Sequence, residues 1–436
     1  MAKKIYDFNL GYTLLRPYVC WCFRFFYSAL RVEGKENLPK GKPYILAPNH
    51  QNALMDALVV LATNRKRTVF LARSDIFKSP IFAAILRFLK IMPIYRIRDG
   101  RGELGKNEEV FEDSADVLHA GYSLCLMPEG QQSFKRKLLP LVKGTFRIAF
   151  LTQESLSDED LLIIPVGIDY GDYVNEGSHL TIRYGTPINV RQHMADYEEQ
   201  PARALKTMQE ELSVGIDSLI QNIRSEEYYE LFYRLSLMFC SAIAGKGGYF
   251  ARLDARRTIT NVLNEMEQTD AERVGQLQRL TDEYTGVLKK HKLTDEVVRK
   301  NGIPVALLAM QSIVLLLCFP FTAVAWLLNT VPAYVPRIFT RKFKNKEFVA
   351  SVNVVGYLAV LFILMLALFI VSIFIVVPLW IAPVLLFVTP VLRRGIYAYS
   401  RYCKKLVKGI RFAATAKQAR QSIIGLRQQI AQLLGR

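Results

Sequence analysis

Acidic residues are missing from the last fifth of this 436-residue chain: no Asp or Glu follows Glu347, whereas Lys and Arg continue to Arg436. The formal net charge is +18, and 51% of the residues are hydrophobic. This hydrophobic fraction exceeds what a soluble enzyme requires. A basic half that carries long apolar runs favours an anionic membrane surface as the partner. Nucleic acid is the alternative partner for so much positive charge, and the apolar runs make it the weaker hypothesis.

Metal-ligand spacing is absent from the cysteines. Only Trp21 separates the closest pair, Cys20 and Cys22, which is too short a gap for a C-x-x-C motif. We interpret the six cysteines as reduced thiols that fill apolar space, and we predict no metal site. A cleavable signal peptide is also missing, because the aromatic stretch after Lys3 and Lys4 is interrupted and lacks a small-residue cleavage site. We therefore expect a retained, cytosolic N-terminus.

Two further catalytic signatures are absent. The glycine cluster at residues 245–248 lacks the spacing of a phosphate-binding P-loop, so it predicts a turn between helices. Ser133 is a possible nucleophile by residue type alone, because no G-x-S-x-G elbow surrounds it.

Short apolar runs alternate with helical patterns between Arg31 and about Val190. The pattern predicts strands at residues 44–47, 68–72, 123–127, 161–168 and 180–184, and helices at residues 53–64, 80–90, 108–120 and 144–152. Strands separated by helices imply an α/β fold with a mostly parallel sheet flanked by helices. The loops beyond the strand ends are then the natural place for a site.

The whole chain divides into five predicted regions. Residues 1–30 mix aromatic residues with Arg16 and Arg24, which favours a helix at a membrane interface, the alternative being an amphipathic helix packed on the core. Residues 31–195 form the α/β domain. Residues 196–300 are polar and helical in period, a linker region of unassigned role, and 301–395 form a membrane region. The basic tail 396–436 resembles a segment that binds anionic lipid, or a partner-binding helix.

The membrane region holds two apolar blocks, at residues 303–335 and 348–392. As one helix the second block would be roughly 65 Å long, about twice the hydrocarbon core of a bilayer, so it should fold back on itself. Basic residues flank both blocks, and if they mark the cytosolic side, each block enters and leaves from the same face. We therefore predict two helical hairpins, spanning or re-entrant, and an α/β domain that faces the cytoplasm. The alternative is a pair of single crossings.

The segment that carries the chemistry is Ala47-Pro48-Asn49-His50, followed by Asp56. His50 lies just after a predicted strand, and Asp56 lies within the next helix. Six residues correspond to about 600° on an ideal helix, so the two side chains can meet only if His50 lies in the loop before the helix. Asp56 could then hold the imidazole and favour its protonated form while it deprotonates an alcohol. For the pair alone, a helix-capping arrangement is an equally good interpretation.

Other residues could complete a site. Arg96 closes an apolar segment, and Lys143 precedes a predicted helix start whose free N–H groups suit a phosphate. Glu129, at the end of a strand, could bond a hydroxyl of a polyol or support the loops of the site.

Together these motifs resemble the four blocks of the glycerolipid acyltransferase family, the bacterial lysophosphatidate acyltransferase type. Their order and approximate spacing match, over about residues 30–190. The four blocks are Asn49-His50 with Asp56, Pro93 to Arg96, Pro128-Glu129-Gly130 with Ser133, and Ile164-Pro165-Val166. Further echoes are Val32-Glu33-Gly34, Asn37-Leu38-Pro39, Lys143-Gly144 and Tyr184-Gly185-Thr186-Pro187.

The resemblance implies that His50 is the general base and Asp56 its partner. It also implies that the block with Arg96 helps to bind the acceptor's phosphate, and that Glu129 and Gly130 contribute to the acceptor site. The acyl group would pass directly from a thioester, acyl-CoA or acyl carrier protein, to a hydroxyl, with no metal, cofactor or covalent enzyme intermediate. Because a thioester is already activated, deprotonation and positioning can supply most of the acceleration.

Two departures from the family pattern bear on the substrate. Five residues separate His50 from Asp56, where four are usual, a spacing that also resembles some glycerol-3-phosphate acyltransferases. In the third block Gln131 and Gln132 replace the usual Thr and Arg, so a basic neighbour, Lys135 or Arg136, would have to substitute. The leading hypothesis is a membrane-bound acyltransferase that acts on lysophosphatidate or glycerol 3-phosphate in phospholipid biosynthesis. The alternatives are a lysophospholipid-remodelling acyltransferase and a catalytically silent lipid-binding protein.

Overall fold

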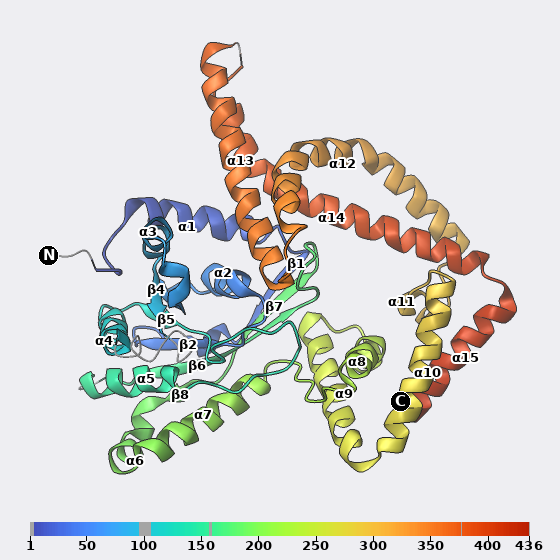
Figure 1. The fold of residues 1–436 in the computed structure, drawn as a ribbon. Coiled ribbons are helices and arrows are strands. Elements are labelled where there is room, and N and C mark those ends of the chain that lie inside the picture. The colour runs from blue at the N-terminus through green and yellow to red at the C-terminus, as the bar shows by residue number, and fades with distance from the viewer. Residues whose placement is uncertain (1–3, 96–105, 157–158, 376, 436) are drawn as a thin grey trace. The chain divides into compact units, whose positions relative to one another are not determined.

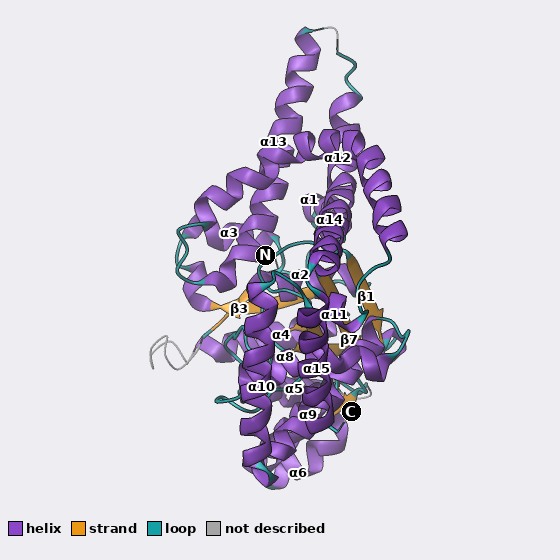
Figure 2. Ribbon diagram, turned by 90° about the vertical axis from the view of Figure 1, so that its right-hand side faces the viewer, coloured by secondary structure: helices purple, strands orange, loops and turns teal. Residues whose placement is uncertain are grey.

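The computed structural model describes residues 4–95, 106–156, 159–375 and 377–435, so Arg96 lies outside the described residues. The chain divides into two compact units. The first comprises Met1–Ile220 and Val335–Ala359, and the second comprises Gln221–Tyr334 and Val360–Arg436. Strands occur only in the first unit among the described residues, and the second unit is helical (Figure 2).

The first unit is built on one sheet with the order β1-β7-β6-β2-β5-β3-β4, and β8 pairs with β6. All pairs are parallel except β6 with β7 and β6 with β8. The strands are β1 (Ala29–Glu33), β2 (Tyr44–Pro48), β3 (Thr68–Arg73), β4 (Ile91–Ile94), β5 (Ser123–Cys125), β6 (Leu162–Tyr170), β7 (His179–Tyr184) and β8 (Ile188–Asn189). The predicted mostly parallel sheet is confirmed.

Helices cover both faces of this sheet (Figure 1). Ile45 and Ala47 of β2 join a core with α4, α5 and α7, whereas the alternating residue Tyr44 bonds Asn64 at the end of α2. The helices of the domain are α1 (Leu10–Phe23), α2 (Ala53–Thr63), α3 (Pro80–Phe88), α4 (Lys106–His119), α5 (Gly144–Ser155), α6 (Met194–Glu199) and α7 (Pro201–Asp217). Residues 196–220, which we assigned to the linker, therefore belong to the α/β domain, because α7 packs on its core.

The N-terminal helix α1 is shorter than expected, because the chain enters the sheet already at Ala29. One side of α1 packs on the domain: Tyr12 is buried, and the Arg16 guanidinium donates to the carbonyl oxygen of Asn64 at 2.9 Å. Leu10 and Leu14 point outward and are exposed. The helix thus combines a packed face with an exposed apolar face.

The second unit unites two segments that the sequence analysis kept apart. Helices α8 (Tyr229–Ala244), α9 (Tyr249–Thr269), α10 (Ala271–Lys290) and α11 (Asp295–Arg299) share one core with the tail helix α15 (Lys417–Leu433). Ile423 and Ile430 of α15 are fully buried in it, and Arg427 pairs with Asp295 at 2.7 Å. The apolar face of α15 therefore packs within this unit, so our interpretation of the tail as a lipid-binding segment is wrong for this helix.

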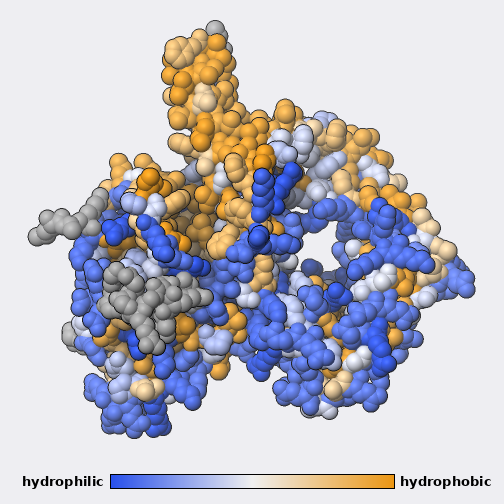
Figure 3. Space-filling model, viewed as in Figure 1, coloured by the Kyte–Doolittle hydropathy of each residue, from blue (hydrophilic) through white to orange (hydrophobic). Residues whose placement is uncertain are grey.

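Three helices are long and apolar enough to cross a membrane: α12 (Val305–Thr340), the stretch Lys346–Phe374 that contains α13 (Val349–Phe374), and α14 (Ile381–Ala414). Their side chains are largely exposed, and apolar surface gathers over α12 and α13 (Figure 3). The second apolar block folds back between α13 and α14, as expected. The first block does not: α12 continues through Pro320 as one helix, because a bend at proline suffices and the chain need not reverse there.

The end of α12 and the start of α13 belong to the first unit. Tyr357 is fully buried and packs edge-on against Phe26, with ring centroids 5.2 Å apart. Thr340 bonds the Asn353 side chain at 3.0 Å, and Arg337 pairs with Glu176 at 3.4 Å. This base of the two apolar helices is therefore fixed on the α/β domain.

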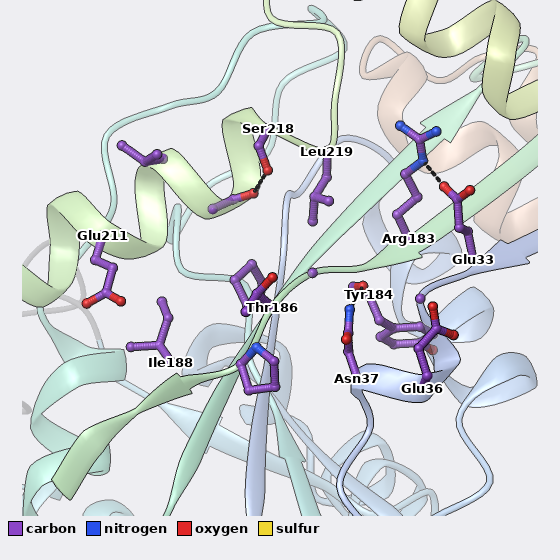
Figure 4. Close-up of a pocket in the computed structure, with 16 residues that line it drawn as sticks. Glu33, Glu36, Asn37, Arg183, Tyr184, Thr186, Ile188, Glu211, Ser218 and Leu219 are labelled. Atoms are coloured by element: carbon purple, nitrogen blue, oxygen red, sulfur yellow. Dashed lines mark hydrogen bonds and ion pairs between the residues drawn. The ribbon is translucent and has the colours of Figure 1, made fainter. Parts of the chain in front are cut away.

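A cavity of about 550 Å³ lies beside the carboxyl ends of β1 and β7 (Figure 4). In the sheet, β6 lies between these two strands and β2, which His50 follows. At its rim Gly34 has φ +75°, and the Asn37 side chain donates to the Tyr184 carbonyl at 2.8 Å. The Gly34 and Tyr184 motifs are thus explained by packing between β1 and β7.

This packing predicts a large loss of stability for Gly34→Ala. Its Cβ would lie 2.0 Å from the Tyr184 carbonyl oxygen, in addition to the strain at φ +75°. We expect a loss of more than about 2 kcal/mol. Gly41→Ala is the matched control, because its φ is +81° and nothing lies within 4 Å; it should cost only about 1 kcal/mol. Thermal unfolding of the full-length protein in detergent measures both, and equal losses would contradict the proposed clash.

Candidate active site

His50 and Asp56 form the centre of the site. His50 lies in the loop after β2, and its Nδ1 is 2.9 Å from Oδ2 of Asp56 in the first turn of α2. The imidazole is 19% exposed and the carboxylate is 0% exposed. The structure therefore brings the two residues together, with the ring at the surface and the carboxylate behind it.

The buried carboxylate of Asp56 is held by three further donors. Its Oδ2 accepts from the backbone N–H groups of Gln51 and Asn52, both at 2.8 Å. Its Oδ1 accepts from the Tyr170 hydroxyl at 2.6 Å. Donors on both oxygens replace the water that burial removes and fix the orientation of the carboxylate toward the imidazole.

The additional residue between His50 and Asp56 is accommodated at the start of α2. Ala53, the first residue of the helix, has φ +44°, a conformation that non-glycine residues rarely adopt. One more residue in a regular helix would turn the carboxylate by about 100°. The left-handed backbone at Ala53 lets the longer loop close on His50, so this strain lies directly beside the reacting pair.

Tyr170 and Tyr173 are functional residues that the sequence analysis missed. Tyr170 ends β6, and its side chain is fully buried against Asp56. Tyr173 follows in the next loop and donates to the Gln51 side chain at 2.8 Å. A signal was present, because β6 was a predicted strand and the carboxyl ends of neighbouring parallel strands meet at one edge. The predicted strand ended at residue 168, two residues too early to include Tyr170.

Asn49 joins the loop of His50 to β6. Its side chain accepts from the Ile168 N–H at 2.7 Å and donates to the Ile168 carbonyl at 3.1 Å. These two bonds continue the β2–β6 ladder beyond Pro48, which pairs with Val166. The backbone position of His50 is therefore set by the sheet itself.

Glu129 connects two backbone segments of the site. Its Oε1 accepts from the His50 N–H at 2.7 Å, and its Oε2 accepts from the Leu139 N–H at 2.9 Å. The residue is buried, and burial raises the pKa of its carboxyl to about 7. Of the two roles that we considered for Glu129, this geometry matches the support of loops and not a bond to a hydroxyl.

Gly130 and Ser133 shape the loop that follows Glu129. Gly130 has φ +63°, and a Cβ there would lie 3.1 Å from Val142. The Ser133 N–H donates to the His50 carbonyl at 3.3 Å, and its hydroxyl accepts from the Lys135 N–H at 3.2 Å. The loop is thus tied to the histidine through its backbone.

The basic residues considered for phosphate binding lie in different surroundings. Arg136 is buried and bonds Asp169 and the Tyr170 carbonyl, so it cannot replace the missing arginine of the third block. Lys135 and Lys143 are exposed, and Lys143 precedes α5 as expected. A Cβ on Gly144 would lie 3.8 Å from the Ile94 side chain, so the start of α5 is close to the end of β4. No cluster that could hold a metal ion occurs among the residues that the structure describes.

The raised pKa of Glu129 predicts a pH dependence of stability. Between about pH 4.3, the pKa of an unfolded glutamate, and about pH 7 the folded protein holds a proton that the unfolded chain has released. The stability from this group is therefore full at low pH and is lost as the pH rises through that window. Thermal unfolding from about pH 5 to pH 8 should show a decline that Glu129→Gln, which cannot ionise, lacks. Equal slopes for the variant and the wild type would contradict this assignment.

Comparisons with known proteins identify an acyltransferase domain in the first half of the chain. Residues 29–169 match the family model described as Acyltransferase. None of the curated proteins matches the chain. Among solved structures, the 1-acyl-sn-glycerophosphate (LPA) acyltransferase PlsC from Thermotoga maritima is 22% identical, with 48% of this chain and 78% of that chain covered and a TM-score of 0.35. The segment matched by the family model includes both His50 and Asp56.

Proposed function

We propose that the protein transfers a fatty acyl group from a thioester, acyl-CoA or acyl carrier protein, to the hydroxyl of a glycerol-phosphate-type acceptor. Lysophosphatidate and glycerol 3-phosphate are the two acceptors of this proposal. The observation that carries it is the 2.9 Å contact between His50 and a buried Asp56, within a family that performs acyl transfer.

The proposed reaction uses His50 as the base. Its Nδ1 faces Asp56, so Nε2 is the nitrogen available to an acceptor hydroxyl. Nε2 takes the hydroxyl proton as the oxygen attacks the thioester carbonyl, and the carbon–sulfur bond then breaks. The departing thiolate receives the proton from the imidazolium. Asp56 stabilises the imidazolium between these two steps, and the Tyr170 hydroxyl keeps the carboxylate oriented.

The acceptor's phosphate needs cations, and the third block lacks its usual arginine. Gln132 stands there, and its amide donates to the Glu347 carboxylate at 2.8 Å. Glu347 lies in the connection between α12 and α13, beside the exposed Lys344 and Lys346. We infer that this connection forms one side of the acceptor site. Arg96 and Lys143 complete the proposed set of phosphate contacts, and Ser133 lies in the loop that bonds the backbone of His50.

The location follows from the same proposal. An acceptor or product with acyl chains lies in a bilayer, and the three apolar helices are compatible with membrane association. We propose that the catalytic domain faces the cytoplasm, where acyl thioesters are found. We propose no nucleic-acid partner.

Replacement of His50 tests the proposed chemistry. His50→Ala should lower transfer of labelled acyl-CoA by about 10²–10⁴-fold, the contribution of a general base. His119→Ala is the matched control, because His119 bonds Ser155 outside the site. Membranes with each variant are assayed with lysophosphatidate, glycerol 3-phosphate and lysophospholipids, so that the same experiment identifies the acceptor. Equal transfer by His50→Ala and the wild type would remove the catalytic role and favour a silent lipid-binding protein.

The bond between Gln132 and Glu347 can be tested by exchange of the two residues. Gln132→Glu places two carboxylates in contact and should lower kcat/KM by more than about fivefold, the effect of one lost hydrogen bond. The double variant Gln132→Glu/Glu347→Gln restores a donor–acceptor pair with the same total charge, and it should recover most of the activity. Hydrogen exchange at the Ser133 N–H should rise in the single variant and return in the double variant. No recovery of either quantity would show that the pair does not position the loop.

A further inference from the structure

Both ends of α12 lie on the same side of the membrane. Among the described residues, no helix before Val305 is long and apolar enough to cross a bilayer, so the start of α12 is on the side of the α/β domain. The other end is fixed to that domain by the Arg337–Glu176 ion pair. A helix that crosses once must begin and end on opposite sides. Therefore α12, although it would be about 54 Å long if straight, does not cross.

A basic helix runs along α12. Asn329 of α12 donates to the Thr389 carbonyl of α14 at 3.2 Å, and a Cβ on Gly409 would lie 2.7 Å from Leu308. These contacts are about 30 Å apart on each helix, so α12 and α14 lie side by side and antiparallel. Seven cations occur between the two contacts or just beyond: Arg393, Arg394, Arg401, Lys404, Lys405, Lys408 and Arg411. So many charges cannot lie in hydrocarbon, which keeps this pair of helices at the level of the headgroups.

The hairpin of α13 and α14 is too short to span a bilayer. The first part of α13, to Ala359, packs with the α/β domain, which leaves residues 360–374 to enter the membrane, about 22 Å of helix. On the return, residues 381–392 of α14 are uncharged before Arg393, about 18 Å of helix. The hydrocarbon core is about 30 Å thick.

The tip of the hairpin lacks the residues that an aqueous surface requires. No charged residue occurs between Glu347 and Arg393. Ile375, Leu379 and Trp380 at the turn are 54%, 48% and 63% exposed. Apolar surface covers this end of α13 (Figure 3). A turn that emerged on the far side would place these side chains in water, whereas a turn inside the bilayer buries them in lipid.

We propose that the protein is monotopic: all three apolar helices enter and leave the bilayer from the side of the catalytic domain. The tip near Leu379 ends within the hydrocarbon, and α12 lies in the near leaflet. The exposed cations of α14 meet anionic headgroups: Arg394, Arg401, Lys404 and Arg411. The apolar side chains of these helices and the cations of α14 therefore bind the near leaflet of the bilayer. This inference concerns the membrane alone and does not depend on acyl transfer.

Cysteine labelling in sealed proteoliposomes tests the topology. The accessible thiols Cys20, Cys318 and Cys403 are first replaced by serine, and the buried Cys22, Cys125 and Cys240 are kept. Single cysteines at Asn301, Lys342 and Leu379 are then treated with a membrane-impermeant maleimide from either face. Lys35→Cys, in the catalytic domain, marks its side.

Asn301→Cys and Lys342→Cys should react from the same face as Lys35→Cys. Leu379→Cys should react from neither face until detergent is added. Opposite faces for Asn301→Cys and Lys342→Cys, or reaction of Leu379→Cys from the far face, would overturn the proposal.

Fluorescence of Trp380 provides a test that leaves the tip unchanged. With Trp21 and Trp326 replaced by phenylalanine, Trp380 is the only tryptophan in the chain. Lipids brominated near the ends of their acyl chains should quench it at least about twofold more than lipids brominated near the headgroups, because the tip lies deep in the hydrocarbon. Quenching by an aqueous quencher confined to the far side would contradict the proposal.

Discussion

The site depends on the buried carboxylate of Asp56. A charge removed from water is unfavourable unless donors replace its hydration, and here the backbone N–H groups of Gln51 and Asn52, the Tyr170 hydroxyl and His50 do so. These donors come from the loop before α2 and from the end of β6, and the carboxylate itself belongs to α2. The requirement to satisfy one carboxylate thus fixes three segments at once, and the imidazole is oriented as a consequence.

The sequence predicts the central strands better than the edge strands. β2 and β6 are buried on both faces, so they appear as continuous apolar runs. β1 and β4 lie at the two edges of the sheet, where half-buried residues weaken the pattern. β1 was not predicted, and of β4 only a strand end near Arg96 was expected. His50 and Asp56 were found through their motif. Tyr170 was missed because its role depends on strand order, which no local pattern contains.

Dependence on tertiary contacts, which no local pattern contains, also explains the wrong predictions for the helical part of the chain. The polarity of α15 indicates one buried face, but not which surface covers it, and Ile423 and Ile430 pack into a core formed more than a hundred residues earlier. The basic flanks of the first apolar block predicted a hairpin, whereas α12 continues through the block as one helix. The role of Glu129 also depends on tertiary contacts, since both carboxylate oxygens accept from backbone groups of the loops that it joins.

Arg16 connects the exposed N-terminal helix to the catalytic pair. Its guanidinium bonds the carbonyl oxygens of Asn64 and Lys66 where α2 ends, a position at which positive charge stabilises a helix. Asp56 lies at the opposite end of that same helix. Helix α2 is therefore held at one end by α1 and at the other by the contact between Asp56 and His50. The packing of α1 thus contributes to the position of the carboxylate that orients the imidazole.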